Sequence, residues 1–83
     1  MRIVAAAVRV NGLTISLPRP ARHYQIIAAM PAKMAAAVRP SEQGFLTDTG
    51  TFLGRKQALD VARHMKQLKA ETNKPELYSE DLW

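Results

Sequence analysis

The sequence predicts an α+β fold: a small single domain of two β-hairpins and two helices, with a docked C-terminal tail. Three observations predict this class. Apolar stretches flank two short turn sequences, helical periodicity follows each of these pairs, and an apolar segment ends the chain. The chain has only 83 residues, which allows one thin core and no second one. We therefore expect residues 1–83 to form one domain, with residues 76–83 as its tail.

The first hairpin is predicted over residues 3–17. Residues 3–10 are rich in Ala and β-branched side chains, and residues 13–17 are again mainly apolar. Asn11-Gly12 between them is the strongest short signal for a hairpin, because both residues tolerate a positive φ. We expect apolar side chains of both strands to form the buried face, namely Ile3, Val10, Leu13, Ile15 and Leu17.

A first helix is predicted from residue 21. Prolines at positions 18 and 20 end the preceding strand, since proline has no N–H for a ladder, and a proline suits the first turn of a helix. Pro31 ends or kinks this helix, and residues 32–38 form a further short helical turn. Side chains spaced by three and four residues are expected on the inner face, namely Tyr24, Ile27, Ala28 and Met34.

Residues 45–53 form two β-prone arms around Asp48-Thr49-Gly50, which predicts the second hairpin. The clearest helix of the chain follows Gly54, and Thr72-Asn73 is expected to end it. Its apolar face carries Ala58, Val61, Ala62, Met65 and Leu68, and its polar face Lys56, Asp60, Arg63, Lys66 and Gln67. All four glycines are expected at turns: Gly12, Gly44, Gly50 and Gly54.

Charge is distributed unevenly along this basic protein. The net charge is +5, yet residues 1–41 hold six basic side chains and no acidic one, whereas residues 42–83 hold six basic and seven acidic. A basic half attracts nucleic acid, phosphorylated ligands or an acidic protein surface. No Cys is present, which excludes disulfides and thiolate metal sites. No apolar run approaches the roughly 20 residues that span a bilayer, so no membrane association is expected.

Two basic constellations are candidates for anion binding. Gly54-Arg55-Lys56 stands at a predicted helix start, where free N–H groups and the helix dipole favour an anion. That anion is either an external phosphate or the chain's own Glu80-Asp81. Arg22-His23 opens the first helix, where the histidine makes either a structural hydrogen bond or a contact to phosphate. The apolar residues of the tail are expected to bury against this chain or a neighbour.

The chain carries no Walker loop, dinucleotide-binding glycine pattern, zinc signature or nucleophile motif. We therefore expect a protein that is not an enzyme and uses no cofactor and no metal. The thin core also makes a homo-oligomer the expected state, because a domain of this size is marginally stable alone.

Three segments of this chain together form a recognisable pattern. They are Arg22-His23, the stretch EQGFLTDTGTF at residues 42–52 with the following Arg55, and the terminal SEDLW at residues 79–83. With the opening Asn-Gly hairpin, they resemble a family of small bacteriophage and prophage proteins of uncharacterised function. The resemblance spans nearly the whole chain, but Gly54 and Lys56 replace the acidic residues usual on either side of the helix arginine. It implies a phage origin, action in the host cytoplasm and a shared polar cluster.

The leading hypothesis is a phage accessory protein that binds a phosphate-bearing ligand through a basic pocket. The ligand would be an anionic small molecule such as a nucleotide signal of host defence. The predicted ligand-binding residues are Arg22, His23, Glu42, Gln43, Arg55, Lys56, Ser79, Glu80 and Asp81. Among them, the basic side chains and His23 would meet the phosphate, and Gln43 would add polar recognition.

Two alternatives come from other classes of host interaction. The first is binding of nucleic acid by Arg2, Arg9, Arg19, Arg22 and Arg39, which would weaken steeply as the salt concentration rises. The second is an inhibitor or adaptor that docks on a host protein. A ligand is favoured over both if five residues surround one hollow, namely Arg22, His23, Gln43, Arg55 and Glu80.

Overall fold

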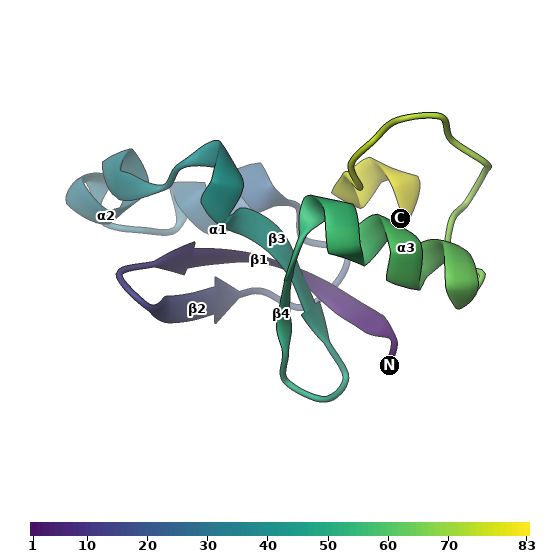
Figure 1. The fold of residues 1–83 in the computed structure, drawn as a ribbon. Helices are drawn as coiled ribbons and strands as arrows, with labels where there is room; N and C mark the ends of the chain where they lie inside the picture. The colour runs from purple at the N-terminus through teal and green to yellow at the C-terminus, as the bar shows by residue number, and fades with distance from the viewer.

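A four-stranded antiparallel sheet and three α-helices make up the computed structural model, which describes residues 1–83. The strand order is β2-β1-β3-β4. The strands are β1 (Ile3–Val10), β2 (Leu13–Ser16), β3 (Gln43–Thr47) and β4 (Phe52–Gly54), and the helices are α1 (His23–Ala28), α2 (Ala32–Ala37) and α3 (Arg55–His64). Two 3₁₀ helices are η1 (Pro40–Glu42) and η2 (Ser79–Asp81). Figure 1 shows the helices on one side of the sheet, and the predicted α+β class is confirmed.

The first hairpin turns at the predicted position. Asn11 has φ 50° and Gly12 has φ 82°, so both residues occupy the left-handed region that a tight hairpin turn requires. The register pairs Val10 with Leu13. Leu13 is 61% exposed, which contradicts its predicted burial, because it lies beside the turn on an edge strand of the sheet.

The hydrophobic core lies between the sheet and helices α1 and α3. Phe45 is fully buried at its centre, and the T-shaped contact of the His23 ring with it joins α1 to β3. Most of the other core side chains are aliphatic, as the composition requires. The buried cluster consists of Ile3, Ala6, Val8, Ile26, Phe45, Leu53, Ala58, Leu59, Ala62 and Leu77.

Gly44 lies inside strand β3 and not at a turn, which corrects the expectation for this glycine. A Cβ atom at this position would lie 2.1 Å from the Leu53 carbonyl oxygen and 2.7 Å from Cζ of Phe52. The close pairing of β3 with β4 therefore requires a residue without a side chain. The Gly44 carbonyl oxygen also lies 2.6 Å from Nε2 of His23, which fixes α1 on the sheet.

Helix α3 ends at His64, well before the predicted end at Thr72-Asn73. Lys66 has φ 57°, and the Gln67 N–H donates to the Ala62 carbonyl at 2.8 Å, as in a Schellman motif. Gln67 was predicted on the polar face, but its side-chain amide forms two 2.9 Å hydrogen bonds with the backbone of Ile3. These bonds draw the chain away from the helix axis toward the start of β1.

The C-terminal tail is docked, as predicted. Leu77 is fully buried, and its N–H donates to the carbonyl of Arg55 at 3.1 Å. The Arg22 guanidinium donates to Oγ of Ser79 at 3.3 Å and also to the main-chain oxygen of Trp83. The tail thus contacts the starts of both α1 and α3, although it follows them in sequence by many residues (Figure 1). None of the helices has the length and apolar character needed to cross a bilayer.

The close approach at Gly44 gives a testable prediction for stability. Gly44→Ala should lower the free energy of unfolding by about 3 kcal/mol, because the added methyl group forces β3 and β4 apart. Denaturant unfolding measures this loss. Gly54→Ala is the matched control, since a Cβ there meets no atom within 4 Å, and it should cost less than about 1 kcal/mol. Equal losses in the two variants would contradict the argument.

Candidate ligand-binding site

A hollow of about 380 Å³ opens between the starts of α1 and α3 and the tail. We call it the tail hollow. Six of its residues were predicted as ligand-binding residues, and they come from four separate stretches of the chain. These six include the five residues whose position around one hollow was expected to favour a ligand over the two alternatives. The lining consists of Arg22, His23, Tyr24, Gln43, Arg55, Tyr78, Ser79 and Glu80.

His23 forms part of the wall of the tail hollow. It is buried, and its Nε2 donates a hydrogen bond to the Gly44 carbonyl oxygen. Burial lowers the pKa of His23; the bond to Gly44 raises the pKa, and the charge of Arg55 lowers it further. The net direction is downward, so the ring is neutral near pH 7. The one ring N–H of a neutral His23 is already used, and no ring proton is left to donate to a phosphate.

Arg22 fastens the tail through its guanidinium bonds to Ser79 and Trp83. Its backbone N–H donates to Oε1 of Gln25 at 2.8 Å, which satisfies the start of α1. The guanidinium of Arg19 lies 5.2 Å from the centre of the Trp83 ring. Arg22 therefore has a structural role as well as a place in the hollow, and part of its donor capacity is already used.

Arg55 is the first residue of α3, and its charge has no carboxylate partner in the chain. One guanidinium nitrogen, Nη2, donates to Oε1 of Gln43 at 3.0 Å, and the group lies 4.9 Å from the centre of the Tyr78 ring. Its Nε is buried and has no hydrogen-bond partner. A buried donor without an acceptor is costly, so Arg55 is the least satisfied polar group around the hollow.

The start of α3 adds to the positive potential near Arg55. No side chain caps the helix at Gly54, and its first turn holds no acidic residue. The first N–H groups of a helix have no partner within the helix and carry the positive end of its dipole. This end of α3 therefore favours an anion.

Glu80 and Asp81 of the tail pair with Lys74 and not with the start of α3. Nζ of Lys74 lies 2.8 Å from Oδ1 of Asp81 and 3.7 Å from Oε1 of Glu80. The hydrogen bond that Lys74 donates to the Asp81 carboxylate raises the pKa of Lys74. The alternative in which Glu80-Asp81 supplies the anion for Gly54-Arg55-Lys56 is therefore wrong. Asp81 lies outside the tail hollow, whereas Glu80 is part of its wall.

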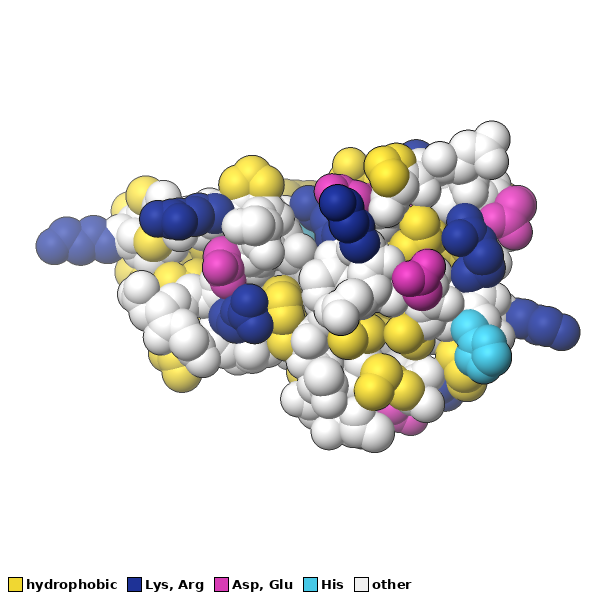
Figure 2. Space-filling model, in the orientation of Figure 1, with side chains coloured by type: hydrophobic (Ala, Val, Ile, Leu, Met, Phe, Trp, Pro, Cys, Tyr) yellow, Lys and Arg dark blue, Asp and Glu magenta, His cyan; other side chains and the backbone are white.

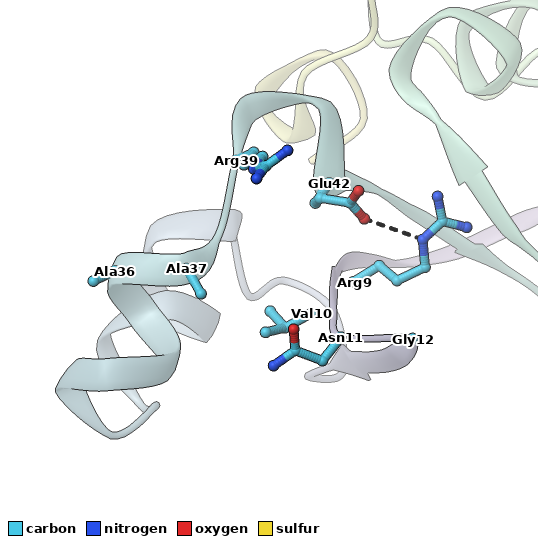
Figure 3. A pocket seen from close by; sticks show the side chains of 8 residues that line it. All are labelled: Arg9, Val10, Asn11, Gly12, Ala36, Ala37, Arg39 and Glu42. Atoms are coloured by element: carbon cyan, nitrogen blue, oxygen red, sulfur yellow. Dashed lines mark hydrogen bonds and ion pairs between the residues drawn. The ribbon is translucent and has the colours of Figure 1, made fainter.

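Two further predicted residues lie in neighbouring hollows. Glu42 pairs with Arg9 at 3.1 Å in a hollow of about 490 Å³ between the β1–β2 turn and α2, where Arg39 also lies (Figure 3). Lys56 lines a hollow of about 390 Å³ that shares Gln43 and Arg55 with the tail hollow. The structure thus separates Glu42 from the other predicted residues and places Lys56 in a hollow that adjoins the tail hollow.

Sequence reasoning missed the two tyrosines of the hollow, Tyr24 and Tyr78. Tyr24 was predicted on the inner face of α1 but is 69% exposed, and Ile26 takes the buried position. Helix α1 has only six residues, so its periodicity spans too few turns to fix which face is buried. The available signals were the position of Tyr24 next to Arg22-His23 and that of Tyr78 next to Ser79-Glu80.

The burial of His23 predicts how stability changes with pH. Its pKa is lower in the folded protein than the ordinary value of 6.5, so the unfolded chain binds more protons between the two values. The free energy of unfolding should therefore fall as the pH decreases below about 6.5. His23→Gln should remove this slope between pH 7.5 and 5.5 in denaturant unfolding. The control His64→Gln, at an exposed position, should keep it, and a slope that persists in His23→Gln would refute the assignment.

Comparison with known proteins adds one match. A family model described as phage T4 y16D protein matches residues 2–83. No curated protein and no solved structure matches the chain. The match agrees with the resemblance to small phage proteins of uncharacterised function. Because it covers nearly the whole sequence, the chain belongs to the phage T4 y16D protein family.

Proposed function

We propose that this phage protein binds a phosphate-bearing small molecule in the tail hollow and catalyses no reaction on it. The observation that carries the proposal is the guanidinium of Arg55, which donates one hydrogen bond, to Gln43, and forms no ion pair with a carboxylate of the chain. A phosphate oxygen is the acceptor that such a group lacks, because guanidinium–phosphate hydrogen bonds are charge-assisted and short. Binding would therefore give the charge of Arg55 an anionic partner that the chain itself does not supply.

The charges around the hollow support an anionic ligand of limited charge. Arg22 and Arg55 each contribute a positive charge, and Glu80 contributes a negative one. The start of α3 adds its partial positive charge beside Arg55. The surroundings thus remain positive overall, yet they offer one carboxylate acceptor as well as several donors.

The size of the hollow supports a small molecule. A volume of about 380 Å³ lies near the lower end of the range for small-molecule pockets. The fold also holds the wall in place, because His23 is bonded to the sheet and Arg22 to the tail. A largely preformed hollow of this kind suits a ligand of roughly the size of a nucleotide.

The arginines of the nucleic-acid alternative are less available. Arg9 pairs with Glu42 and lies over the Phe52 ring, and Arg19 lies over the Trp83 ring. Figure 2 shows basic side chains scattered over this face among acidic and apolar ones, without one continuous basic patch. Binding of nucleic acid, docking on a host protein and self-association stay predictions from the sequence.

Removal of the Arg55 charge tests the proposal. Isothermal titration of the full chain should show binding of at least one ligand among inorganic phosphate, pyrophosphate, ribose 5-phosphate, nucleoside mono- and diphosphates and cyclic dinucleotides. Arg55→Gln should weaken that binding by about 10- to 100-fold, because a hydrogen bond to a charged group contributes roughly 1.5–3 kcal/mol.

Arg39→Gln is the matched control for Arg55→Gln. It removes the same charge from an exposed arginine that makes no ion pair and lines a different hollow. This variant should bind as the wild type does. Equal weakening in both variants would indicate only a general effect of net charge. Absence of binding across the panel by folded wild-type protein would refute the proposed function.

A further inference from the structure

We infer that the ligand of the tail hollow is a nucleotide whose base stacks on the ring of Tyr24. The inference rests on the proposed phosphate site at Arg55 and names the chemical class of its ligand. Tyr24 lines the same hollow as Arg55, from the first turn of α1.

Tyr24 is the one aromatic residue of the chain without a partner for its ring. It is also the most exposed large hydrophobic residue, at 69%. Its hydroxyl makes no hydrogen bond within the chain, and neither an aromatic ring nor a cation lies over it. The other four rings have such partners: His23 for Phe45, Arg9 for Phe52, Arg19 for Trp83, and both Arg55 and Lys74 for Tyr78.

The position of Tyr24 makes this exposure informative. A single exposed aromatic side chain is common on protein surfaces and needs no explanation by itself. This one borders the hollow that also holds Arg55, whose charge has no ion-pair partner in the chain. It also follows His23, whose hydrogen bond to Gly44 holds the first turn of α1 against the sheet. The ring therefore lines the same hollow as the proposed phosphate site, where a planar group of the same ligand can reach it.

Two polar groups of the hollow also favour a ligand with more than a phosphate. The side-chain oxygen of Gln43 accepts from Arg55, which leaves its amide N–H groups free to donate. The Glu80 carboxylate is largely exposed, and its ion pair with Lys74 is long, at 3.7 Å. A carboxylate repels phosphate but accepts from ring N–H and exocyclic amino groups. The donor of Gln43 and the acceptor of Glu80 therefore suit the polar edge of a nucleobase, and the unpartnered ring of Tyr24 suits its face.

The test compares ligands that differ in the base alone. Isothermal titration of the full chain with AMP, GMP, CMP, UMP and ribose 5-phosphate should show that at least one nucleotide binds about 10-fold or more tightly than ribose 5-phosphate, because stacking of a base on an aromatic side chain adds affinity of this order. Tyr24→Ala should abolish the difference, so that the nucleotide binds no more tightly than ribose 5-phosphate. Tyr24→Phe keeps the ring and should keep the preference.

Leu13→Ala is the control, because Leu13 is similarly exposed but lies at the β1–β2 turn; this variant should bind as the wild type does. If no nucleotide binds more tightly than ribose 5-phosphate while Arg55→Gln still weakens binding, the inference fails and the phosphate site stands. If Tyr24→Ala keeps the nucleotide preference but lowers the mass measured by light scattering, Tyr24 contacts a second copy and the inference is refuted. If no phosphate compound binds, both proposals fail.

Discussion

The hydrogen bond from Nε2 of His23 to the Gly44 carbonyl oxygen positions much of the candidate site. The two residues are buried neighbours, so the residues that flank them are forced together. Arg22 and Tyr24 flank His23, and Gln43 precedes Gly44. One bond between α1 and β3 therefore brings three residues of the tail hollow close to one another. It depends on the burial of His23 against the sheet and on a strand position that excludes any side chain.

The features that the sequence predicted correctly depend on local chemistry. The turn at Asn11-Gly12 needs only two residues that tolerate a positive φ, and Pro31 ends α1 because proline lacks an N–H. The early end of α3 depends instead on Gln67, whose amide bonds reach Ile3 at the other end of the chain. The spacing of apolar residues along a helix carries no information about a contact with a residue so distant in the sequence. The prediction that Leu13 is buried was wrong for a similar reason, because the sequence does not say which strand will lie at the edge of the sheet.

The candidate site could be predicted only in part. The sequence gives the number of charged residues but does not say which of them form ion pairs with one another. The sequence shows seven acidic residues in its second half, and three of them, Glu76, Glu80 and Asp81, lie in the tail. Either Arg55 or Lys74 could have paired with Glu80 and Asp81. The structure pairs both with Lys74, only a few residues away, and leaves Arg55 without a carboxylate. The pair of Lys74 with Glu80, whose carboxylate is 70% exposed, contributes little to stability. Because Glu80 and Asp81 pair with Lys74, the charge of Arg55 has no ion-pair partner within the chain.

The polar residues of the family-like segments divide into those that the fold explains and those that it does not. Arg22 and Ser79 join two of these segments, and His23 is bonded to a third. These three residues would be needed even if the protein bound nothing, so they are weak evidence for a ligand. Arg55 is different, because its charge has no ion-pair partner within the chain. Arg55 and the unpartnered ring of Tyr24 line one hollow, and the internal contacts of the fold account for neither of them, which is why the proposed ligand is placed there.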